Sequence, residues 1–409
     1  MTPLPSILFT AFEPSGDDHA AAVVEELRRR HPALPIHAWG GPGMERAGAT
    51  IVERTGDDAV MGLPGYQKIR EHTRINDRIA RWLDANPVTV HVPVDSPAAN
   101  FPICALAKAR GAKVVHLVAP QIWAWGRWRI HKLRRRTDMV LCLLPFEEGF
   151  FHKRGVRARF IGHPLYDAPV DSADVGRRGT GFGTGSPRIA LMPGSRPGEI
   201  EKNTPLLLAC FASLRAEYPR LAGIVAATKP AVADRIRAIA ADHGGWPEGL
   251  DVVCGDTDAV IRWCDLALVA SGTVTLQIAR QLKPMVVFYK SSPLFYYLLA
   301  RWLVSTKFFA LPNVLAHREV VPEFIPHFGG PDRIVQAARG LIESPELAER
   351  QREEFRRLAA MFQGRHAAAS AADAIEEVAG LRGQEPTPVP VAHPPPIPRP
   401  RPGPAPVAG

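Results

Sequence analysis

Short runs of apolar and β-branched residues alternate with longer amphipathic stretches along most of this chain. Such alternation is typical of βαβ units, in which helices connect parallel strands and cover their sheet. An interval rich in Gly, Ser and Arg, residues 171–187, divides the alternation into two series. The pattern therefore predicts an α/β protein with two doubly wound domains and a ligand-binding cleft between them. The expected strands lie near residues 7–12, 36–40, 89–95, 114–120, 139–144 and 158–163, and near 188–194, 223–228, 250–255, 266–271 and 284–290.

Length and spacing set the expected domain boundaries. A chain of 409 residues is too long for one ordinary core. Apolar positions at near-helical spacing follow the second series, and these helices could pack back on the first domain. Eleven of the last 27 residues are Pro, which predicts a disordered tail, with a polyproline docking segment as the alternative. The expected division is a first domain over residues 1–170, a linker over 171–187, a second domain over 188–344, C-terminal helices over 345–382 and the tail over 383–409.

The composition is close to that of ordinary globular proteins, with 46% hydrophobic and 22% charged residues. It argues against a disordered or membrane-spanning chain. The most lipophilic stretch, Pro293–Val304, is interrupted by Arg301 and is far shorter than the roughly 20 residues that span a bilayer. The N-terminal residues show no basic leader and no cleavage site, so we expect a soluble cytoplasmic protein.

The net charge and the cysteine content limit which partners and cofactors are expected. The net charge of +9 favours an anionic partner, and nucleic acid, membrane headgroups and phosphorylated substrates all remain open. The five cysteines are scattered and include no Cys-x-x-Cys pair, which indicates reduced thiols. No His or Cys spacing suits a metal ion, so we expect no structural metal and no cofactor.

Two turns of the first domain carry candidate catalytic groups. Residues 12–17 read Phe-Glu-Pro-Ser-Gly-Asp between a strand and a helix, where free backbone N–H groups and the helix dipole favour an anion. Asp95 follows another expected strand, and the carboxyl end of a buried strand is a suitable place for a general base. A plain helix cap is the structural alternative for both turns.

Two turns of the second domain have the features of an anion site. Residues 192–196 read Met-Pro-Gly-Ser-Arg; Gly194 lets a phosphate approach the backbone, Ser195 adds donors, and Arg196 supplies a charged fork for diphosphate oxygens. Residues 270–273, Ala-Ser-Gly-Thr, repeat this strand, turn and helix arrangement. The Gly-Lys-Ser/Thr ending of a nucleotide-hydrolase loop is missing. The two turns together predict a nucleotide diphosphate site, with simple tight turns as the alternative.

Aromatic and basic residues are interleaved in residues 123–136, which contain three Trp and six Lys/Arg. This composition suits stacking on single-stranded nucleic acid or docking at a lipid headgroup surface. The alternative is a solvated basic helix whose Trp residues belong to the core. Pro293–Val304 is a second possible membrane contact or a buried helix.

Several motifs together resemble the lipid-A-disaccharide synthase family, and the similarity is colinear from roughly residue 7 to residue 342. The family's opening Gly-Glu-x-Ser-Gly-Asp resembles residues 12–17, and the Asp and Asn of its Ile-Asp-x-Pro motif fall on Asp95 and Asn100. Its other motifs match Gly40–Met44, Ala59–Gly62, Ala119–Trp125, Leu144–Glu147, Phe160–His163, Pro193–Arg196, Ala270–Thr273, Leu311–Asn313 and Arg318–Glu323.

The resemblance implies a GT-B fold of two Rossmann-like domains and a cytoplasmic enzyme on the cytosolic face of the inner membrane. Such an enzyme transfers 2,3-diacylglucosamine from UDP to the 6-hydroxyl of 2,3-diacylglucosamine 1-phosphate, inverts the anomeric carbon, releases UDP and binds no nucleic acid. An epimerase acting on UDP-N-acetylglucosamine and a non-catalytic sugar-nucleotide-binding paralogue remain the alternatives. The oligomeric state stays open.

The resemblance also assigns roles to residues of this chain. Asp95 would be the general base and Glu13 would lie near the reacting sugar. The expected substrate-binding residues are Ser15, Gly16, Asn100, Gly194, Ser195, Arg196, Ser271, Gly272, Thr273, Gln277, Asn313, Arg318 and Glu319. The expected membrane or lipid contacts are Trp123, Trp125, Trp128, Arg129, Lys132, Arg134 and Arg135.

The sequence departs from the family pattern at five positions. Ala98 and Gln277 each stand where the family usually has a carboxylate, so two acidic groups are missing from the expected cleft. Phe12 replaces a Gly, Gly126 replaces a basic residue, and Pro326 replaces a Gln. These changes allow an altered sugar or acyl preference, or loss of activity.

Overall fold

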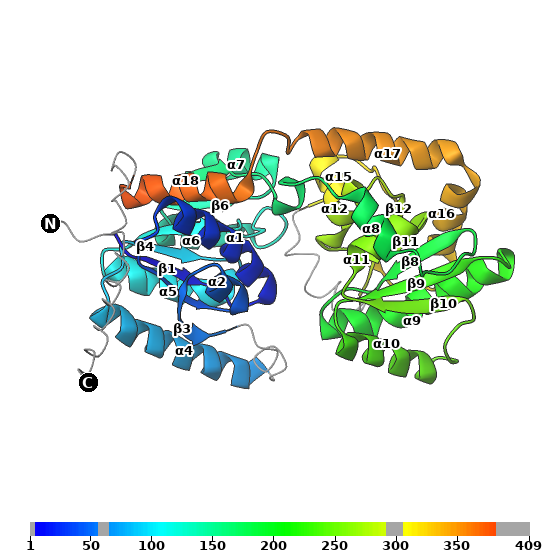
Figure 1. Ribbon diagram of the computed structural model, residues 1–409, viewed down its shortest axis with the longest axis horizontal. Coiled ribbons are helices and arrows are strands. Elements are labelled where there is room, and N and C mark those ends of the chain that lie inside the picture. Colours follow the sequence, from blue (N-terminus) through cyan, green and yellow to red (C-terminus); the bar gives the residue numbers. More distant parts are fainter. Residues whose placement is uncertain (1–4, 56–64, 292–305, 382–409) are drawn as a thin grey trace, which may run out of the picture.

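The computed structural model describes residues 5–55, 65–291 and 306–381, with strands arranged in two parallel sheets that lie in separate halves of the molecule (Figure 1). Ala59–Gly62, the lipophilic stretch Pro293–Val304 and the Pro-rich tail lie outside these described residues. Within them, no helix combines the length and the apolar character that crossing a bilayer requires.

The first sheet has seven parallel strands in the order β3-β2-β1-β4-β5-β6-β7. The order reverses between β1 and β4, which is the arrangement of a doubly wound sheet. The sequence pattern missed β3, because this edge strand is half exposed and ends in Glu53 and Arg54. The strands are β1 (Ile7–Thr10), β2 (Ile36–Gly40), β3 (Thr50–Arg54), β4 (Val90–Pro93), β5 (Lys113–Leu117), β6 (Met139–Cys142) and β7 (Ala158–Phe160).

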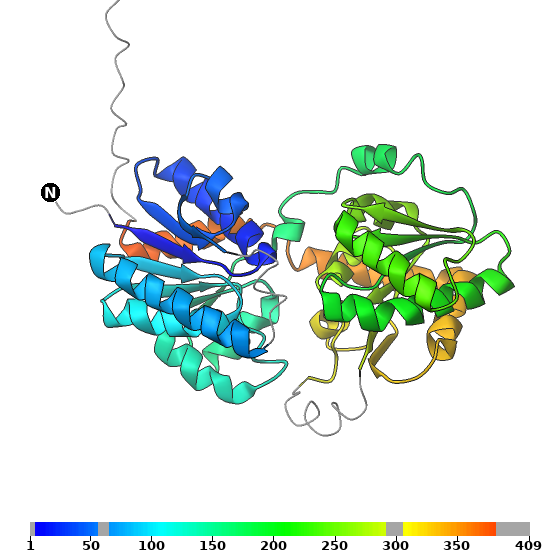
Figure 2. The ribbon, with the colours of Figure 1, turned by 90° about the horizontal axis from the view of Figure 1, so that it is seen from below.

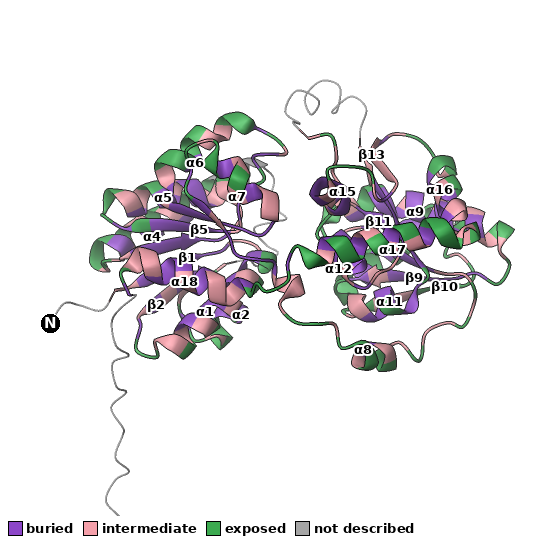
Figure 3. Ribbon diagram, turned by 90° about the horizontal axis from the view of Figure 1, so that it is seen from above, coloured by how far each residue is buried: buried purple, intermediate pink, exposed green. Residues whose placement is uncertain are grey.

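Helices cover both faces of the first sheet (Figure 2). The apolar sides of α1 and α18 pack on one face, and those of α4 and α5 pack on the other. Figure 3 colours the strands of the sheet mostly as buried and the outer sides of the helices mostly as exposed. The helices are α1 (Pro14–Arg30), α2 (Pro42–Arg46), α4 (Gly65–Ala85), α5 (Pro97–Ala109), η1 (Arg127–Arg129), α6 (Ile130–Arg136), α7 (Pro145–His152), η2 (Pro164–Tyr166) and α18 (Ala367–Ala379).

The second sheet has six parallel strands in the order β10-β9-β8-β11-β12-β13, and it reverses between β8 and β11. The sequence pattern missed β13, a half-buried strand that contains Pro326. The strands are β8 (Arg188–Met192), β9 (Ala222–Ala227), β10 (Leu250–Cys254), β11 (Leu266–Ala270), β12 (Met285–Lys290) and β13 (Glu323–His327). The helices are α8 (Ser172–Arg178), α9 (Pro197–Glu217), α10 (Pro230–Asp242), α11 (Thr257–Trp263), α12 (Val274–Arg280), α15 (Leu311–Ala316), α16 (Asp332–Glu343) and α17 (Pro345–Ala360).

The interval expected to be a linker is partly helical, because α8 lies within it and packs against α11. An edge contact between Phe182 and Trp263, with ring centroids 6.2 Å apart, also holds the interval to the second sheet's helices. The domain boundaries themselves stay a prediction.

The C-terminal helical stretch is two helices that pack on different sheets (Figure 1). Phe355 and Leu358 of α17 are buried in the second half, whereas Ile375 of α18 is buried against the first. The chain thus crosses between the halves a second time near Phe362. There Phe362 stacks on Tyr166 of the first crossing, with parallel rings 4.4 Å apart.

Asp17 joins the start of α1 to the start of α2. Its carboxylate is buried and accepts hydrogen bonds from the backbone N–H groups of Gly41 (2.8 Å), Gly43 (2.7 Å) and Met44 (3.3 Å). A Cβ atom on Gly41 would lie 2.6 Å from an Asp17 oxygen, and one on Gly43 would lie 2.7 Å from it. The backbone of the Gly-Gly-Pro-Gly-Met motif therefore binds this carboxylate. The contact fixes the turn that follows β1.

We predict that Asp17→Ala lowers the free energy of unfolding by about 2 kcal/mol, because it leaves three buried backbone N–H groups without their charged acceptor. The melting temperature in calorimetry should fall by roughly 4–8 °C. Asp18→Ala is the matched control, since Asp18 is an exposed neighbour on the same helical turn, and it should change stability by less than about 0.5 kcal/mol. Equal melting temperatures for wild type and Asp17→Ala would contradict the role of this contact.

Candidate active site

The four turns that the sequence singles out all lie where a strand order reverses. In the first sheet, residues 12–17 follow β1 and residues 94–97 follow its neighbour β4. In the second sheet, residues 193–196 follow β8 and residues 271–273 follow its neighbour β11. Connections leave such a point in opposite directions, so a crevice opens at the carboxyl ends of the strands. The predicted residues of each sheet thus lie together at the carboxyl ends of neighbouring strands.

An ion pair joins the turns of the two halves. A guanidinium nitrogen of Arg196, from the second half, lies 3.7 Å from a carboxylate oxygen of Glu13, from the first. The Ser96 hydroxyl donates a hydrogen bond of 2.8 Å to the other oxygen of Glu13. The Arg196 side chain is 65% exposed, so most of its surface is free to meet a ligand in the cleft.

Asp95 lies in a turn whose backbone is held in the left-handed region, with φ of 45° at Asp95 and 35° at Ser96. Asn100 holds this turn, because its side-chain N–H groups donate to the carbonyl oxygens of Val94 and Asp95, each at 3.0 Å. The Asn100 oxygen accepts from the Thr10 hydroxyl at 2.7 Å. Asn100 is fully buried, so the structure places it beneath the site rather than on its surface.

Several charges surround the Asp95 carboxylate. Burial raises the pKa of Asp95, and the nearby charge of Glu13 raises it further, while Ser96 N–H, His19 and Arg196 oppose the rise. Burial also lowers the pKa of His19, although the charges of Asp95 and Asp18 act against that change. The sequence analysis did not predict His19 as a site residue. Its position on α1, six residues after Glu13, could have indicated that it lies near the same turn.

Ser15 and Gly16 form the first turn of α1 beside Asp95. Ser15 is exposed and Gly16 is buried. A Cβ atom on Gly16 would lie 3.7 Å from the Val94 side chain and 3.4 Å from that of Ala11, so α1 begins close against the ends of β1 and β4. Phe12, which replaces a smaller residue of the family pattern, packs its ring against His72 of α4 at 5.8 Å.

The turn after β8 wraps around a carboxylate. Gly194 has a φ of 112°, and a Cβ atom there would lie 2.6 Å from a Glu199 oxygen. The backbone N–H groups of Ser195 and Arg196 donate to that same oxygen at 3.2 and 3.3 Å. Asn203 anchors the turn from behind, since its side chain donates to the Pro193 carbonyl at 2.9 Å. The sequence analysis did not single out Glu199 or Asn203.

The turn after β11 is open toward solvent. Gly272 and Thr273 are exposed, and a Cβ atom on Gly272 would meet no atom within 4 Å. The Ser271 hydroxyl donates to the Phe309 carbonyl at 3.2 Å. Gln277 lies one turn into α12 and is partly buried. The structure thus leaves the backbone of this turn accessible to a ligand.

Three other predicted residues are not part of these turns. Asn313 is fully buried, and its amide bonds the backbone of Val321 and the Glu323 carboxylate, each at 2.9 Å. It therefore ties α15 to β13. Arg318 is exposed and forms an ion pair with Glu354 of α17. Glu319 is exposed.

The basic and aromatic segment divides between core and surface. Trp123 is buried, and its indole N–H donates to Glu147 at 2.9 Å. Burial raises the pKa of Glu147 to about 7, against the hydrogen bonds that favour its charged form. Trp125 and Trp128, in contrast, are 47% and 57% exposed. The core interpretation therefore fits Trp123 only.

Arg129 organises the exposed part of this segment. Its guanidinium lies 3.9 Å above the Trp125 ring and 5.8 Å from the Trp128 ring, and it donates to the Trp125 carbonyl at 2.9 Å. A Cβ atom on Gly126 would lie 2.8 Å from both Arg129 and Trp128, which explains a glycine with φ of 66° at this position. Exposed cations continue along α6 at Lys132, Arg134 and Arg135. We call these exposed residues of the segment the cationic and aromatic surface.

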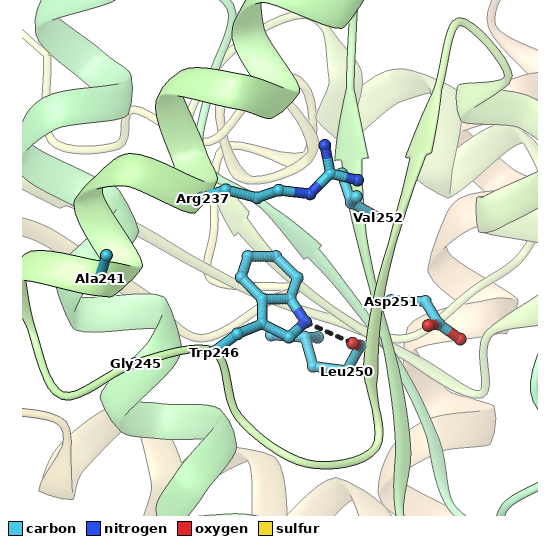
Figure 4. Close-up of a pocket in the computed structure, with 7 residues that line it drawn as sticks. All are labelled: Arg237, Ala241, Gly245, Trp246, Leu250, Asp251 and Val252. Carbon is cyan, nitrogen blue, oxygen red and sulfur yellow. Dashed lines mark hydrogen bonds between the residues drawn. The ribbon is translucent and has the colours of Figure 1, made fainter.

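A cavity of about 340 Å³ lies away from these turns, around Trp246 (Figure 4). Trp246 precedes β10, and its indole N–H donates to the carbonyl of Leu250, the first residue of that strand. The cavity is therefore at the amino end of an edge strand, whereas the predicted site residues follow the carboxyl ends. It takes no part in the candidate site.

Comparisons with known proteins agree with this geometry. The family model described as lipid-A-disaccharide synthetase matches residues 7–375. A lipid-A-disaccharide synthase from Cellvibrio japonicus is 36% identical over 338 residues, which cover 82% of this chain and 87% of that protein.

Solved structures share the fold at low sequence identity. The S. aureus MnaA-UDP co-structure aligns with a TM-score of 0.64 and 13% identity, over 94% of this chain and 99% of that one. The UDP-GlcNAc 2-epimerase from Neisseria meningitidis bound to UDP-GlcNAc aligns with a TM-score of 0.60 and 12% identity, over 91% and 99%. These likenesses show the GT-B fold alone. The family match and the curated relative show more: the chain belongs to the lipid-A-disaccharide synthetase family and is a glycosyltransferase.

Proposed function

We propose that this protein transfers 2,3-diacylglucosamine from UDP to the 6-hydroxyl of 2,3-diacylglucosamine 1-phosphate and releases UDP. Family membership supports a UDP-sugar donor and a sugar acceptor. The observation that carries the residue assignment is the 3.7 Å contact between Glu13 and Arg196. It brings a carboxylate-bearing turn and a diphosphate-suited turn to opposite walls of one cleft.

The second half supplies the donor side. Arg196 and the N-terminal end of α9, a helix of 21 residues, provide a positive fork and a positive dipole for the diphosphate. The open turn of Ser271, Gly272 and Thr273 adds backbone donors nearby in the same sheet. These groups stabilise the charge that develops on UDP as the bond from its β-phosphate oxygen to the sugar breaks.

The first half supplies the base. Asp95 accepts the proton of the acceptor hydroxyl while the oxygen attacks the anomeric carbon and UDP departs from the opposite face, which inverts that carbon. The raised pKa of Asp95 brings its proton affinity closer to neutral pH than that of an ordinary carboxylate. Glu13 keeps the Ser96 hydroxyl and Arg196 in place beside it.

The cationic and aromatic surface suits a lipid headgroup region. Exposed indoles insert at the boundary between headgroups and acyl chains, and neighbouring cations are attracted to anionic lipids. Trp125, Trp128, Lys132 and Arg135 provide both features. Both proposed substrates carry acyl chains, so we place the enzyme at the cytosolic face of the inner membrane.

The alternatives differ in what they require. An epimerase would act on a soluble UDP-sugar without a lipid acceptor, and only structures of about 12% identity point that way. A non-catalytic paralogue would bind UDP and transfer nothing. Ala98, exposed in the first turn of α5, and Gln277 mark the two places where the cleft lacks a carboxylate of the family pattern.

Purified protein, mixed in detergent with UDP-2,3-diacylglucosamine and the phosphorylated acceptor, should release UDP at a rate that depends on the acceptor. A coupled UDP assay measures this, with acceptor-free reactions as the control. Well-folded protein that releases no UDP, or that converts UDP-N-acetylglucosamine without a lipid acceptor, would contradict the proposal.

Asp95→Asn should lower kcat by about 10²- to 10⁴-fold, because the amide cannot accept the proton. Asn is chosen because it tolerates the left-handed backbone that this position requires. The dissociation constant of UDP, measured by calorimetry, should stay within about three-fold of the wild-type value, since the groups that donate hydrogen bonds to UDP lie on the other half. Turnover close to that of wild type would remove Asp95 as the base.

Lys132→Glu should weaken binding to vesicles that contain phosphatidylglycerol by roughly ten-fold or more, because two units of charge change at about 1 kcal/mol each. Vesicle sedimentation at fixed salt measures this. Arg237→Glu makes the same charge change on α10, beside the Trp246 cavity, and should have little effect. An equal loss for both variants would show general electrostatics rather than this surface.

A further inference from the structure

The carboxylate of Glu199 occupies the donors that the proposed function assigns to diphosphate. One of its oxygens accepts from the Ser195 and Arg196 backbone N–H groups at 3.2 and 3.3 Å, and the other accepts from the Arg196 guanidinium at 3.2 Å. The Glu199 side chain is only 13% exposed. The chain therefore provides its own anion at the start of α9.

This arrangement is more than an ordinary helix cap. A capping box needs the acidic side chain at the third helical position to accept only from the N-cap backbone, here that of Arg196. Glu199 also accepts hydrogen bonds from the backbone N–H group of Ser195, the residue before the N-cap, and from the guanidinium of Arg196. Gly194 leaves room for the carboxylate that a side chain would exclude. The whole turn is thus folded around one negative charge.

A second anion cannot use the same donors at full strength. Each backbone N–H group makes one good hydrogen bond, and a diphosphate oxygen bound there would lie close to the Glu199 carboxylate. Two like charges at such a distance repel strongly in a partly desolvated site. Arg196 is also shared, because Glu13 lies 3.7 Å away on its other side. Diphosphate must therefore displace the carboxylate or bind against its charge.

We propose that Glu199 is an internal competitor of the leaving diphosphate. Its carboxylate holds the turn together before UDP binds and returns to the same N–H and guanidinium donors when UDP departs. This inference rests on the proposed function. Its consequence is that UDP binds more weakly than the donor set alone would allow, so the product leaves the enzyme sooner. A residue that merely positions Arg196 would have the opposite effect, because its loss would weaken UDP binding.

Glu199→Gln tests the proposal with little change of shape. The amide oxygen can still accept from the two backbone N–H groups, so the cap is retained while the negative charge is removed. Glu201→Gln is the matched control, since Glu201 is exposed on the same helix and pairs with Arg235 rather than with the turn. Calorimetric titration with UDP and with inorganic diphosphate, at one salt concentration, gives the dissociation constants of all three proteins.

Glu199→Gln should bind both ligands about ten-fold more tightly than wild type, which corresponds to about 1.4 kcal/mol, and UDP should become a stronger product inhibitor. Glu201→Gln should match wild type. Unchanged or weaker binding by Glu199→Gln, with wild-type binding intact, would overturn the inference and leave the proposed function standing. If neither protein binds UDP and no transfer occurs, the proposed function fails and the inference fails with it.

Discussion

The described strands of both sheets all pair in parallel, and this pairing decides where the site residues lie. In a parallel sheet all carboxyl ends lie along one edge, so the turns after β1 and β4, or after β8 and β11, are forced together. Two such sheets with their carboxyl edges facing each other then place four turns around one cleft. The chain crosses between the halves twice, and the stack of Tyr166 on Phe362 joins the two crossings.

Charge complementarity within the cleft follows from that placement. The turn after β8 carries the Arg196 guanidinium, and two carboxylates from different halves, Glu13 and Glu199, lie beside it. The turn after β4 is negative and partly desolvated, which raises the pKa of Asp95. An acceptor hydroxyl beside Asp95 and a diphosphate beside Arg196 are the ligands that these opposite environments favour. Inverting transfer needs one group of each kind on opposite sides of the anomeric carbon.

The sequence predicted most of the fold because buried parallel strands are short apolar runs, and eleven of the thirteen strands in the described part of the chain match such runs. It missed the edge strands β3 and β13, because charged residues end the first and Pro326 interrupts the second. It placed the four turns correctly relative to the strands. Their spatial neighbourhood, however, depends on strand order, which no local pattern contains.

Roles of single residues were harder to predict than the turns that hold them. Asn100 and Asn313 belong to motifs of the family pattern, yet both amides are buried. Asn100 holds the turn of Asp95, whereas Asn313 ties α15 to β13. The sequence did not indicate a role for Glu199, because acidic residues are usual in the first turn of a helix. Trp123 is buried and Trp125 is exposed, because the chain leaves the core between these two residues. Composition alone does not show where that happens.

Asp95 and Arg196, on facing turns, act together only if the protein joins two acylated sugars. Mass spectrometry of the lipid product formed from a defined UDP-2,3-diacylglucosamine and 2,3-diacylglucosamine 1-phosphate tests it most directly. We expect one phosphorylated disaccharide that carries the acyl chains of both substrates. Recovery of both substrates unjoined, or of a product with the acyl chains of only one, would contradict it.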